Sequence, residues 1–163
     1  MLAAIFIAGG AYGTGLIFIA VNRLLDGLDG AIARRAGATA LGGYLDVSLG
    51  LIVMAAIPFA FAIERPQNGL AAAFVILGIL TMAASDLGAR VYAQSAGNRK
   101  PEGVLPAPFA ICEKAETYII YALMTQVAWA FALFAYLYVA LCFLTAGMRF
   151  AAAAAAMRGT NRP

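Results

Sequence analysis

Residues 26–50 read DGLDGAIARRAGATALGGYLDVSLG, and they place charged and small residues at the junction of two apolar segments. Three aspartates, Asp26, Asp29 and Asp46, lie in this stretch, although apolar side chains dominate the chain around it. Ionisable groups beside membrane-crossing segments are costly, so they usually face a polar cavity and have a partner there. How the neighbouring segments pack therefore decides what these carboxylates can do.

The composition of the whole chain indicates a membrane protein. Of its 163 residues, 64% are apolar and 12% are charged, whereas a soluble domain carries about 25% charged residues. Runs of about 20 apolar residues, enough for a helix to cross a bilayer core, recur along the sequence. We predict an all-α fold, a polytopic transmembrane helical bundle that forms one domain over residues 1–163. The predicted spans cover approximately residues 2–23, 41–63, 69–92, 105–126 and 129–150, and a polar tail covers residues 157–163.

The basic residues predict the orientation of the bundle. Arginines and lysines surround the loops 24–40 and 93–104 and follow the last span, whereas Arg65 alone falls on the opposite side. Because cytoplasmic loops are enriched in Lys and Arg, both loops and the C-terminus are predicted to face the cytoplasm. Most acidic residues lie at the same ends of the spans, which predicts a shared cavity there. The positive charge flanks spans that membrane lipids surround, so no nucleic-acid partner is predicted.

The aspartates predict a site for a hard cation. Asp26 and Asp29 are three residues apart and share a helix face, and Asp46 follows a loop long enough for a helical hairpin. Antiparallel neighbours would bring the three carboxylates together at one depth. They could not all stay ionised without a cation, and oxygen ligands favour Mg²⁺, Mn²⁺ or Ca²⁺. The chain has no histidine, and Cys112 and Cys142 are isolated, so a zinc site and histidine acid–base chemistry are excluded.

The remaining residues of the stretch fit a phosphate ligand. The guanidinium groups of Arg34 and Arg35 are planar donors suited to a diphosphate. Glycines would let a bulky ligand approach the backbone closely, and the stretch holds Gly27, Gly30, Gly37, Gly42 and Gly43. A metal-bridged diphosphate at the cytoplasmic interface is one interpretation. The alternative is a solvated interfacial loop with charge pairs, in which the glycines are positions of close helix packing.

The motif resembles the signature of the CDP-alcohol phosphatidyltransferases, which reads D-x-x-D-G-x-x-A-R, seven or eight residues, G-x-x-x-D-x-x-x-D. Seven positions match at the correct spacing, namely Asp26, Asp29, Gly30, Ala33, Arg34, Gly42 and Asp46. The surrounding NRLLDGLDGAIARR and GGYLDVSLG, and an E-x-x-E-T element at residues 113–117, are similar to a bacterial subgroup of the family. The resemblance covers residues 20–60 well and the remainder loosely.

The resemblance implies an activity and a set of site residues. Family members transfer a phosphatidyl or phospho-alcohol group from a CDP-linked donor, commonly CDP-diacylglycerol, to an acceptor alcohol in phospholipid biosynthesis, and they release CMP. Their motif aspartates bind two divalent metals, Mg²⁺ or Mn²⁺, which implies the ligands Asp26, Asp29 and Asp46. Gly30 and Gly42 would lie against the nucleotide, Arg34 would hold the donor diphosphate, and Ala33 completes the substrate-binding set. A bacterial inner-membrane location and a homodimer are also implied.

Two departures from the family pattern bear on activity. Gly50 occupies the position of the fourth aspartate, which in the family is thought to ligate a metal and deprotonate the acceptor, so the catalytic base stays unassigned. The family typically has six spans and its motif begins at the end of the second, whereas here the motif ends the first. We interpret the chain as lacking the family's first span, through truncation, a misplaced start or natural loss. We interpret the chain as an enzyme. The alternatives are a catalytically impaired relative that binds nucleotide, lipid or a partner enzyme, and a small cation transporter.

Several residues outside the motif are candidates for a role in the site or in packing. Glu113 and Glu116 could share a face toward the same cavity, either as ion-pairing residues or as groups that help bind or deprotonate the acceptor. Tyr118 and Tyr121 are interpreted as interface or packing residues. Residues 151–156 are predicted to extend the last span as helix.

Overall fold

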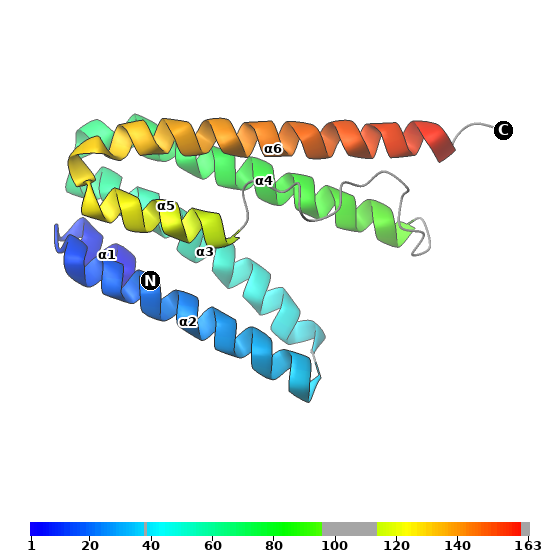
Figure 1. Ribbon diagram of the computed structural model, residues 1–163, viewed down its shortest axis with the longest axis horizontal. Helices are drawn as coiled ribbons and strands as arrows, with labels where there is room; N and C mark the ends of the chain where they lie inside the picture. The colour runs from blue at the N-terminus through cyan, green and yellow to red at the C-terminus, as the bar shows by residue number, and fades with distance from the viewer. Residues whose placement is uncertain (38, 96–113, 161–163) are drawn as a thin grey trace.

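The computed structural model describes residues 1–37, 39–95 and 114–160, and these residues form helices joined by short turns (Figure 1). The elements are α1 (Leu2–Ala8), α2 (Tyr12–Ala36), α3 (Ala40–Glu64), the 3-10 helix η1 (Pro66–Asn68), α4 (Gly69–Ser95), α5 (Lys114–Gln126), the 3-10 helix η3 (Ala128–Ala130) and α6 (Phe131–Thr160). This arrangement confirms the predicted all-α fold.

Three segments of the described chain are long and apolar enough to cross a membrane, namely Leu41–Glu64, Pro66–Ala89 and Ala128–Ala155. They match three of the five predicted spans. The helix α2 is 25 residues long, but its second half carries the charged residues of the motif. The described part of α5 has 13 residues, and residues 105–113 of the predicted fourth span lie outside the described residues. The chain is therefore an all-helical membrane protein.

The predicted first span, residues 2–23, is wrong as a single helix. Gly10 adopts a φ of 75°, a left-handed conformation that favours glycine, and so α1 ends at Ala8. The amide of Ala11 donates to the carbonyl of Phe6, at 2.8 Å, and the amide of Gly10 donates to that of Ile7, at 2.9 Å. These two hydrogen bonds form a Schellman motif, which satisfies the last carbonyls of α1. The chain then reverses, and α2 runs back alongside α1.

The boundary between the last two spans follows the prediction. The helix α5 ends at Gln126, the short η3 makes the turn, and α6 begins at Phe131. The residues 151–156 continue α6 as helix, as predicted, and the helix runs on to Thr160. Trp129 in the turn is 83% exposed, which suits a ring at a membrane–water interface.

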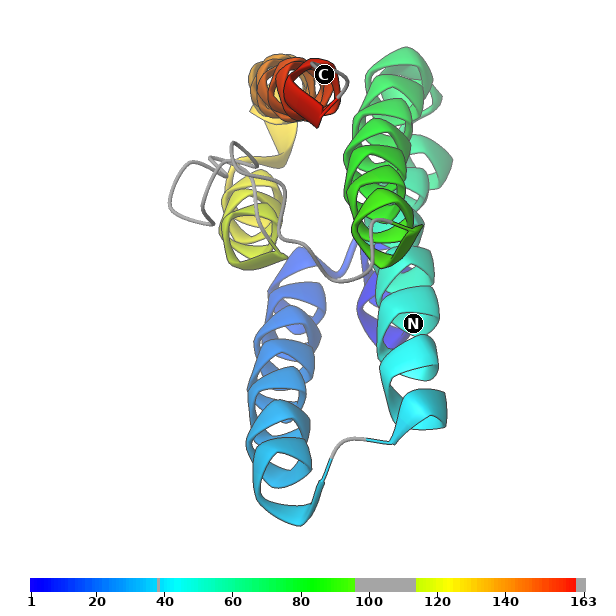
Figure 2. The same cartoon turned by 90° about the vertical axis from the view of Figure 1, so that its right-hand side faces the viewer.

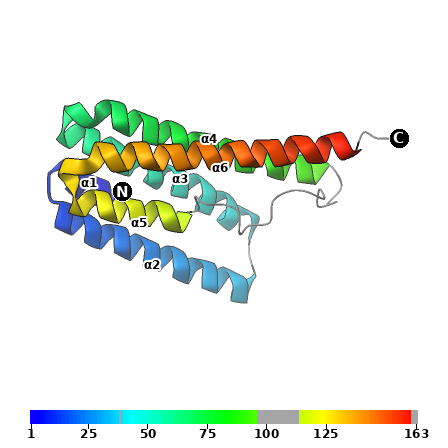
Figure 3. The same cartoon turned by 45° about the horizontal axis from the view of Figure 1, so that its top comes forward.

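The helices follow one another around the bundle in the order α1, α3, α4, α6, α5 and α2, and α2 packs against α1 again. Figures 1 and 3 show α5 between α6 and α2. We call the end where α2, α4 and α6 finish and α3 begins the motif end, and the opposite one the far end. The short α1 lies near the far end. Toward the motif end α2 and α3 therefore have no α1 between them, and they diverge (Figure 2).

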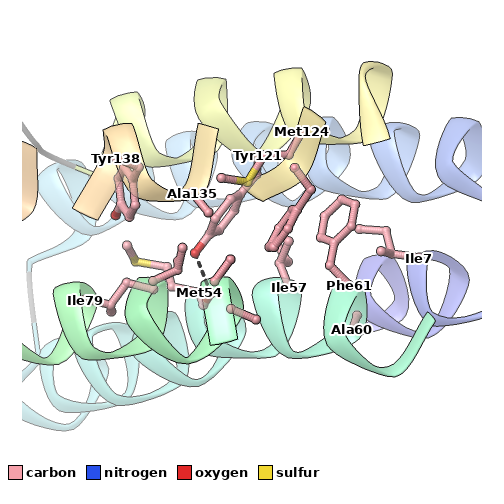
Figure 4. Packing of buried hydrophobic residues seen from close by; sticks show 14 of the residues in the cluster. Ile7, Met54, Ile57, Ala60, Phe61, Ile79, Tyr121, Met124, Ala135 and Tyr138 are labelled. Carbon is pink, nitrogen blue, oxygen red and sulfur yellow. Dashed lines mark hydrogen bonds between the residues drawn. The ribbon is translucent and has the colours of Figure 1, made fainter. Parts of the chain in front are cut away.

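The core is built from rings that meet between α3, α5 and α6 (Figure 4). The rings of Phe61 and Phe131 stack at a centroid distance of 4.6 Å, and Tyr121 lies 6.4 Å from Tyr138. All four side chains are buried. Small residues let α4 and α6 approach closely, since a Cβ on Gly78 would lie 3.3 Å from the Cβ of Cys142. Large apolar side chains on the outer surface, such as Leu80, are exposed and suit contact with lipid.

A proline in the middle of α3 determines one hydrogen bond of this core. In a regular helix the carbonyl of Met54 accepts from the amide four residues later, but that residue is Pro58, which has no N–H. The hydroxyl of Tyr121 on α5 donates to the Met54 carbonyl instead, at 2.7 Å. An unsatisfied carbonyl inside a bilayer costs several kcal/mol. The tyrosine therefore removes a defect that the proline creates, and it attaches α5 to α3.

The tight packing between α1 and α2 predicts an asymmetry between two glycines of α2. A Cβ on Gly15 would lie 2.6 Å from Cγ1 of the fully buried Ile7, whereas a Cβ on Gly13 would meet nothing within 4 Å. We expect Gly15→Ala to lower the free energy of unfolding by about 1–3 kcal/mol through overpacking. The matched control Gly13→Ala should leave it unchanged or raise it slightly. Unfolding in detergent measures both, and equal effects would contradict the α1–α2 packing.

Candidate active site at the motif end

The first half of the motif lies on the last turns of α2. Asp26 is half-buried and Asp29 is exposed, and their spacing of three residues places them on neighbouring turns of one face. Gly30 follows on the same helix, and Ala33 and Arg34 belong to its last turns. The sequence predicts these residues near the end of a helix, and the structure places them in the second half of α2.

The second half of the motif begins α3. Thr39 is the N-cap of this helix, and its Oγ1 accepts a hydrogen bond from the amide of Gly42 at 3.1 Å. A Cβ on Gly42 would lie only 2.9 Å from that Oγ1. The backbone amide of Gly42 thus takes part in the cap, whereas its predicted contact with the nucleotide stays a prediction. Asp46 is exposed one turn further along α3, and Gly50 follows after another turn.

The two halves of the motif lie at the same end of the bundle without forming one metal-binding group. Gly37, with a φ of 92°, ends α2 and starts the connection to α3. Figure 2 shows that the ends of α2 and α3 are well separated there. Within residues 1–37, 39–95 and 114–160, no three acidic or cysteine side chains lie close enough together to bind a metal ion. The predicted gathering of three carboxylates is absent from this arrangement, and their role as ligands stays a prediction.

The helix α5 contributes a residue to the site that the sequence motif does not contain. The Nδ2 of Asn22 on α2 donates to the hydroxyl of Tyr118 on α5 at 3.0 Å. Asn22 lies one helical turn before Asp26, so the bond is formed directly beside the first motif carboxylate. Tyr118 is buried, and its hydrogen bond attaches α5 to the helix that carries the first half of the motif.

The sequence contains features that could have predicted these hydrogen bonds between helices, although none of them belongs to the motif. Asn22 is an amide at the end of an apolar run, and a polar side chain in such a run usually has a partner on another helix. Tyr118 and Tyr121 were predicted to be interface or packing residues. Both are packing residues, and both also form hydrogen bonds between helices. Glu116 is exposed near the start of α5, whereas Glu113 lies outside the described residues.

Comparison with known proteins identifies the family of the chain. The sequence profile described as CDP-alcohol phosphatidyltransferase matches residues 1–157. The chain belongs to the CDP-alcohol phosphatidyltransferase family. An inner membrane protein of Escherichia coli (strain K12), YnjF, is 44% identical over 88 residues, which cover 53% of this chain and 43% of the relative. The chain thus matches less than half the length of this relative. No solved structure matches.

Membership of the family makes Gly50 the position of greatest interest in the phosphatidyltransferase motif. It lies four residues after Asp46 on α3, on the same helix face, and it offers no side chain for metal binding or proton transfer. Glycine leaves the motif with three of its four acidic positions. The donor chemistry of the remaining three carboxylates still fits Mg²⁺ or Mn²⁺, which are held by one or two carboxylates together with substrate phosphates.

The N-cap of α3 gives a test of local geometry at the site. We expect Thr39→Ala to raise the hydrogen-exchange rate of the Gly42 amide about five- to tenfold, because a lost cap costs about 1 kcal/mol. Thr39→Ser keeps an acceptor oxygen and should exchange like the native protein. Hydrogen exchange with residue-level mass spectrometry measures the difference. Equal exchange in all three proteins would show that Thr39 does not cap α3.

Proposed function

We propose that the protein transfers a phosphatidyl or phospho-alcohol group from a CDP-linked donor, CDP-diacylglycerol in the first place, to an alcohol hydroxyl, with release of CMP. The observation that carries this proposal is the seven-position motif, divided between the end of α2 and the start of α3 at one end of the bundle. Family membership supports the reaction class. The acceptor hydroxyl would attack the phosphorus that carries the lipid group, and the bond from that phosphorus to CMP would break.

The motif residues supply complementary contacts to a metal-bound diphosphate. Asp26 and Asp29 on α2 and Asp46 on α3 would hold Mg²⁺ or Mn²⁺, and Arg34 would donate to the diphosphate from the end of α2. The metal, when bound, neutralises charge on the diphosphate and on the departing CMP. Gly30 and Gly42 leave backbone accessible for the nucleotide. These assignments extend the family's pattern to this chain residue by residue.

The base that accepts the hydroxyl proton is the open element of this proposal. Gly50 occupies the family's base position, and Glu116 on α5 is the exposed carboxylate that we propose as a substitute for testing. The same observation favours a second candidate function. A relative that has lost the base would still bind a CDP-linked lipid and a metal without transfer.

We also propose that the motif end faces the cytoplasm in a bacterial inner membrane. Arg35 lies in the last turn of α2 at the motif end and Arg149 in the second half of α6, whereas Arg65 lies in the turn at the far end. Such a distribution follows the enrichment of basic residues on the cytoplasmic side. At the far end the Nε of Arg65 donates to Oε1 of Glu64 at 3.0 Å, and this hydrogen bond raises the pKa of Arg65. The pairing neutralises the arginine on the side where positive charge is disfavoured.

The test is CMP release from CDP-diacylglycerol by purified protein with Mn²⁺ or Mg²⁺, over a panel of acceptor alcohols. We expect acceptor-dependent release by the native protein and a loss of at least about 100-fold in Asp29→Asn, because the carboxylate charge would be needed to hold the metal. The exposed Leu28→Asn on the same helix is the matched control and should retain activity.

Gly50→Asp, measured in parallel, separates the two candidate functions. Release by the native protein would mean that the fourth carboxylate is dispensable here. Silence of the native protein with release by Gly50→Asp would identify a binding protein that lacks only its base. If both are silent and neither CDP-diacylglycerol nor Mn²⁺ raises the melting temperature, the proposal is wrong, since a ligand of the folded state must stabilise it.

A further inference from the structure

Two tyrosines of α5 contact the two helices that carry the motif. Tyr118 bonds to Asn22 of α2 at 3.0 Å, and Tyr121 donates to the Met54 carbonyl of α3 at 2.7 Å. The tyrosines are three residues apart, so they lie on one face of α5, and their rings meet edge to face at 6.5 Å. A single helix thus contacts α2 and α3 through the hydroxyl groups of two tyrosines.

The two contacts lie at different distances from the motif carboxylates along their helices. Asn22 precedes Asp26 by one turn, and Met54 follows Asp46 by eight residues, about two turns. Tyr121 therefore attaches α3 just beyond the motif half of that helix, at the carbonyl that Pro58 leaves without a helical donor. Helix termini can move when few contacts hold them, and α2 and α3 diverge at this end. Two hydroxyl bonds to α5 attach both motif helices to a common neighbour.

The two bonds differ in their environment. Tyr118 is 5% exposed and Tyr121 is 0% exposed, but the bond to Asn22 is partly buried whereas the bond to Met54 is buried. A buried hydrogen bond is not exchanged for one with water, so removal of the Tyr121 hydroxyl leaves the Met54 carbonyl unsatisfied. The helix itself offers the Met54 carbonyl no donor in place of Tyr121, because the residue four positions later is Pro58, which has no N–H.

We propose that Tyr118 and Tyr121 are positioning residues that fix the separation of the two motif halves, and hence the placement of Asp26 relative to Asp46. The proposal rests on the proposed function for its consequence in metal binding, although the positioning itself is a property of the fold. Neither tyrosine needs to touch the donor or the metal. Each acts through the helix to which it is bonded.

The experiment removes one hydroxyl group at a time and keeps the ring. Tyr118→Phe and Tyr121→Phe are compared with Tyr136→Phe, the same chemical change on the half-exposed face of α6, away from the motif helices. Nitroxide labels at two exposed sites, Ile32→Cys on α2 and Leu41→Cys on α3, report the separation of the motif halves by electron spin resonance in lipid nanodiscs. The labels are placed in a background without the native cysteines.

Binding of Mn²⁺ alone, followed by its spin resonance signal in unlabelled protein, is the second readout. We expect Tyr118→Phe and Tyr121→Phe to broaden or shift the label distance and to weaken Mn²⁺ binding about three- to tenfold, the range that one hydrogen bond contributes. Tyr136→Phe should change neither quantity. Asn22→Leu should act like Tyr118→Phe, and the double variant should be no worse than either single one, since both remove the same bond.

The readouts separate a positioning role from a merely structural one. A lower melting temperature in Tyr118→Phe and Tyr121→Phe, with native label distance and native Mn²⁺ affinity, would overturn the proposal. Failure of the proposed function is distinguishable, because a native protein that neither binds Mn²⁺ nor releases CMP still yields a label distance. In that event a changed distance in both variants supports the positioning role, and an unchanged one overturns it.

Discussion

The arrangement of the helices depends on a hydrogen-bond donor for one backbone carbonyl within the membrane, that of Met54. Pro58 deprives Met54 of its helical donor, and water is absent from the bilayer core to replace it. The hydroxyl of Tyr121 fills this place from a different helix, so the defect in α3 becomes a contact with α5. One turn away, Tyr118 bonds to Asn22 and brings α2 to the same face of α5. The order of the helices around the bundle follows, with α5 between α2 and α6 while Tyr121 reaches α3.

Much of this arrangement was predictable from the sequence, because composition and charge constrain a membrane protein strongly. The all-α fold, the turn near Trp129 and the position of the motif at the ends of two helices all follow from apolar run length and from polar residues. The break at Gly10 was missed because a hydropathy argument does not register a left-handed φ. The role of Tyr121 was missed because it depends on a proline 63 positions earlier, and only packing brings the two together.

Part of the candidate site could likewise be predicted from the sequence, and part could not. The placement of the aspartates at one end of the bundle could be predicted, since helix periodicity fixes it. Their mutual distance could not, because it depends on how far α2 and α3 diverge once the short α1 no longer lies between them (Figure 2). Gly42 shows a further limit, since its amide also donates to the Thr39 cap of α3, a contact that the motif does not predict. A family motif therefore identifies positions, and the fold adds the residues that hold them.

The most direct test of this account is a double-mutant cycle between Tyr121 and Pro58, measured by unfolding in detergent. In the native background Tyr121→Phe should lower the free energy of unfolding by about 1–3 kcal/mol, because a buried carbonyl loses its donor. In a Pro58→Ala background an amide is restored to the helix, and the same change should cost less than about 0.5 kcal/mol. Equal costs in the two backgrounds would contradict the claim that the tyrosine compensates for the proline.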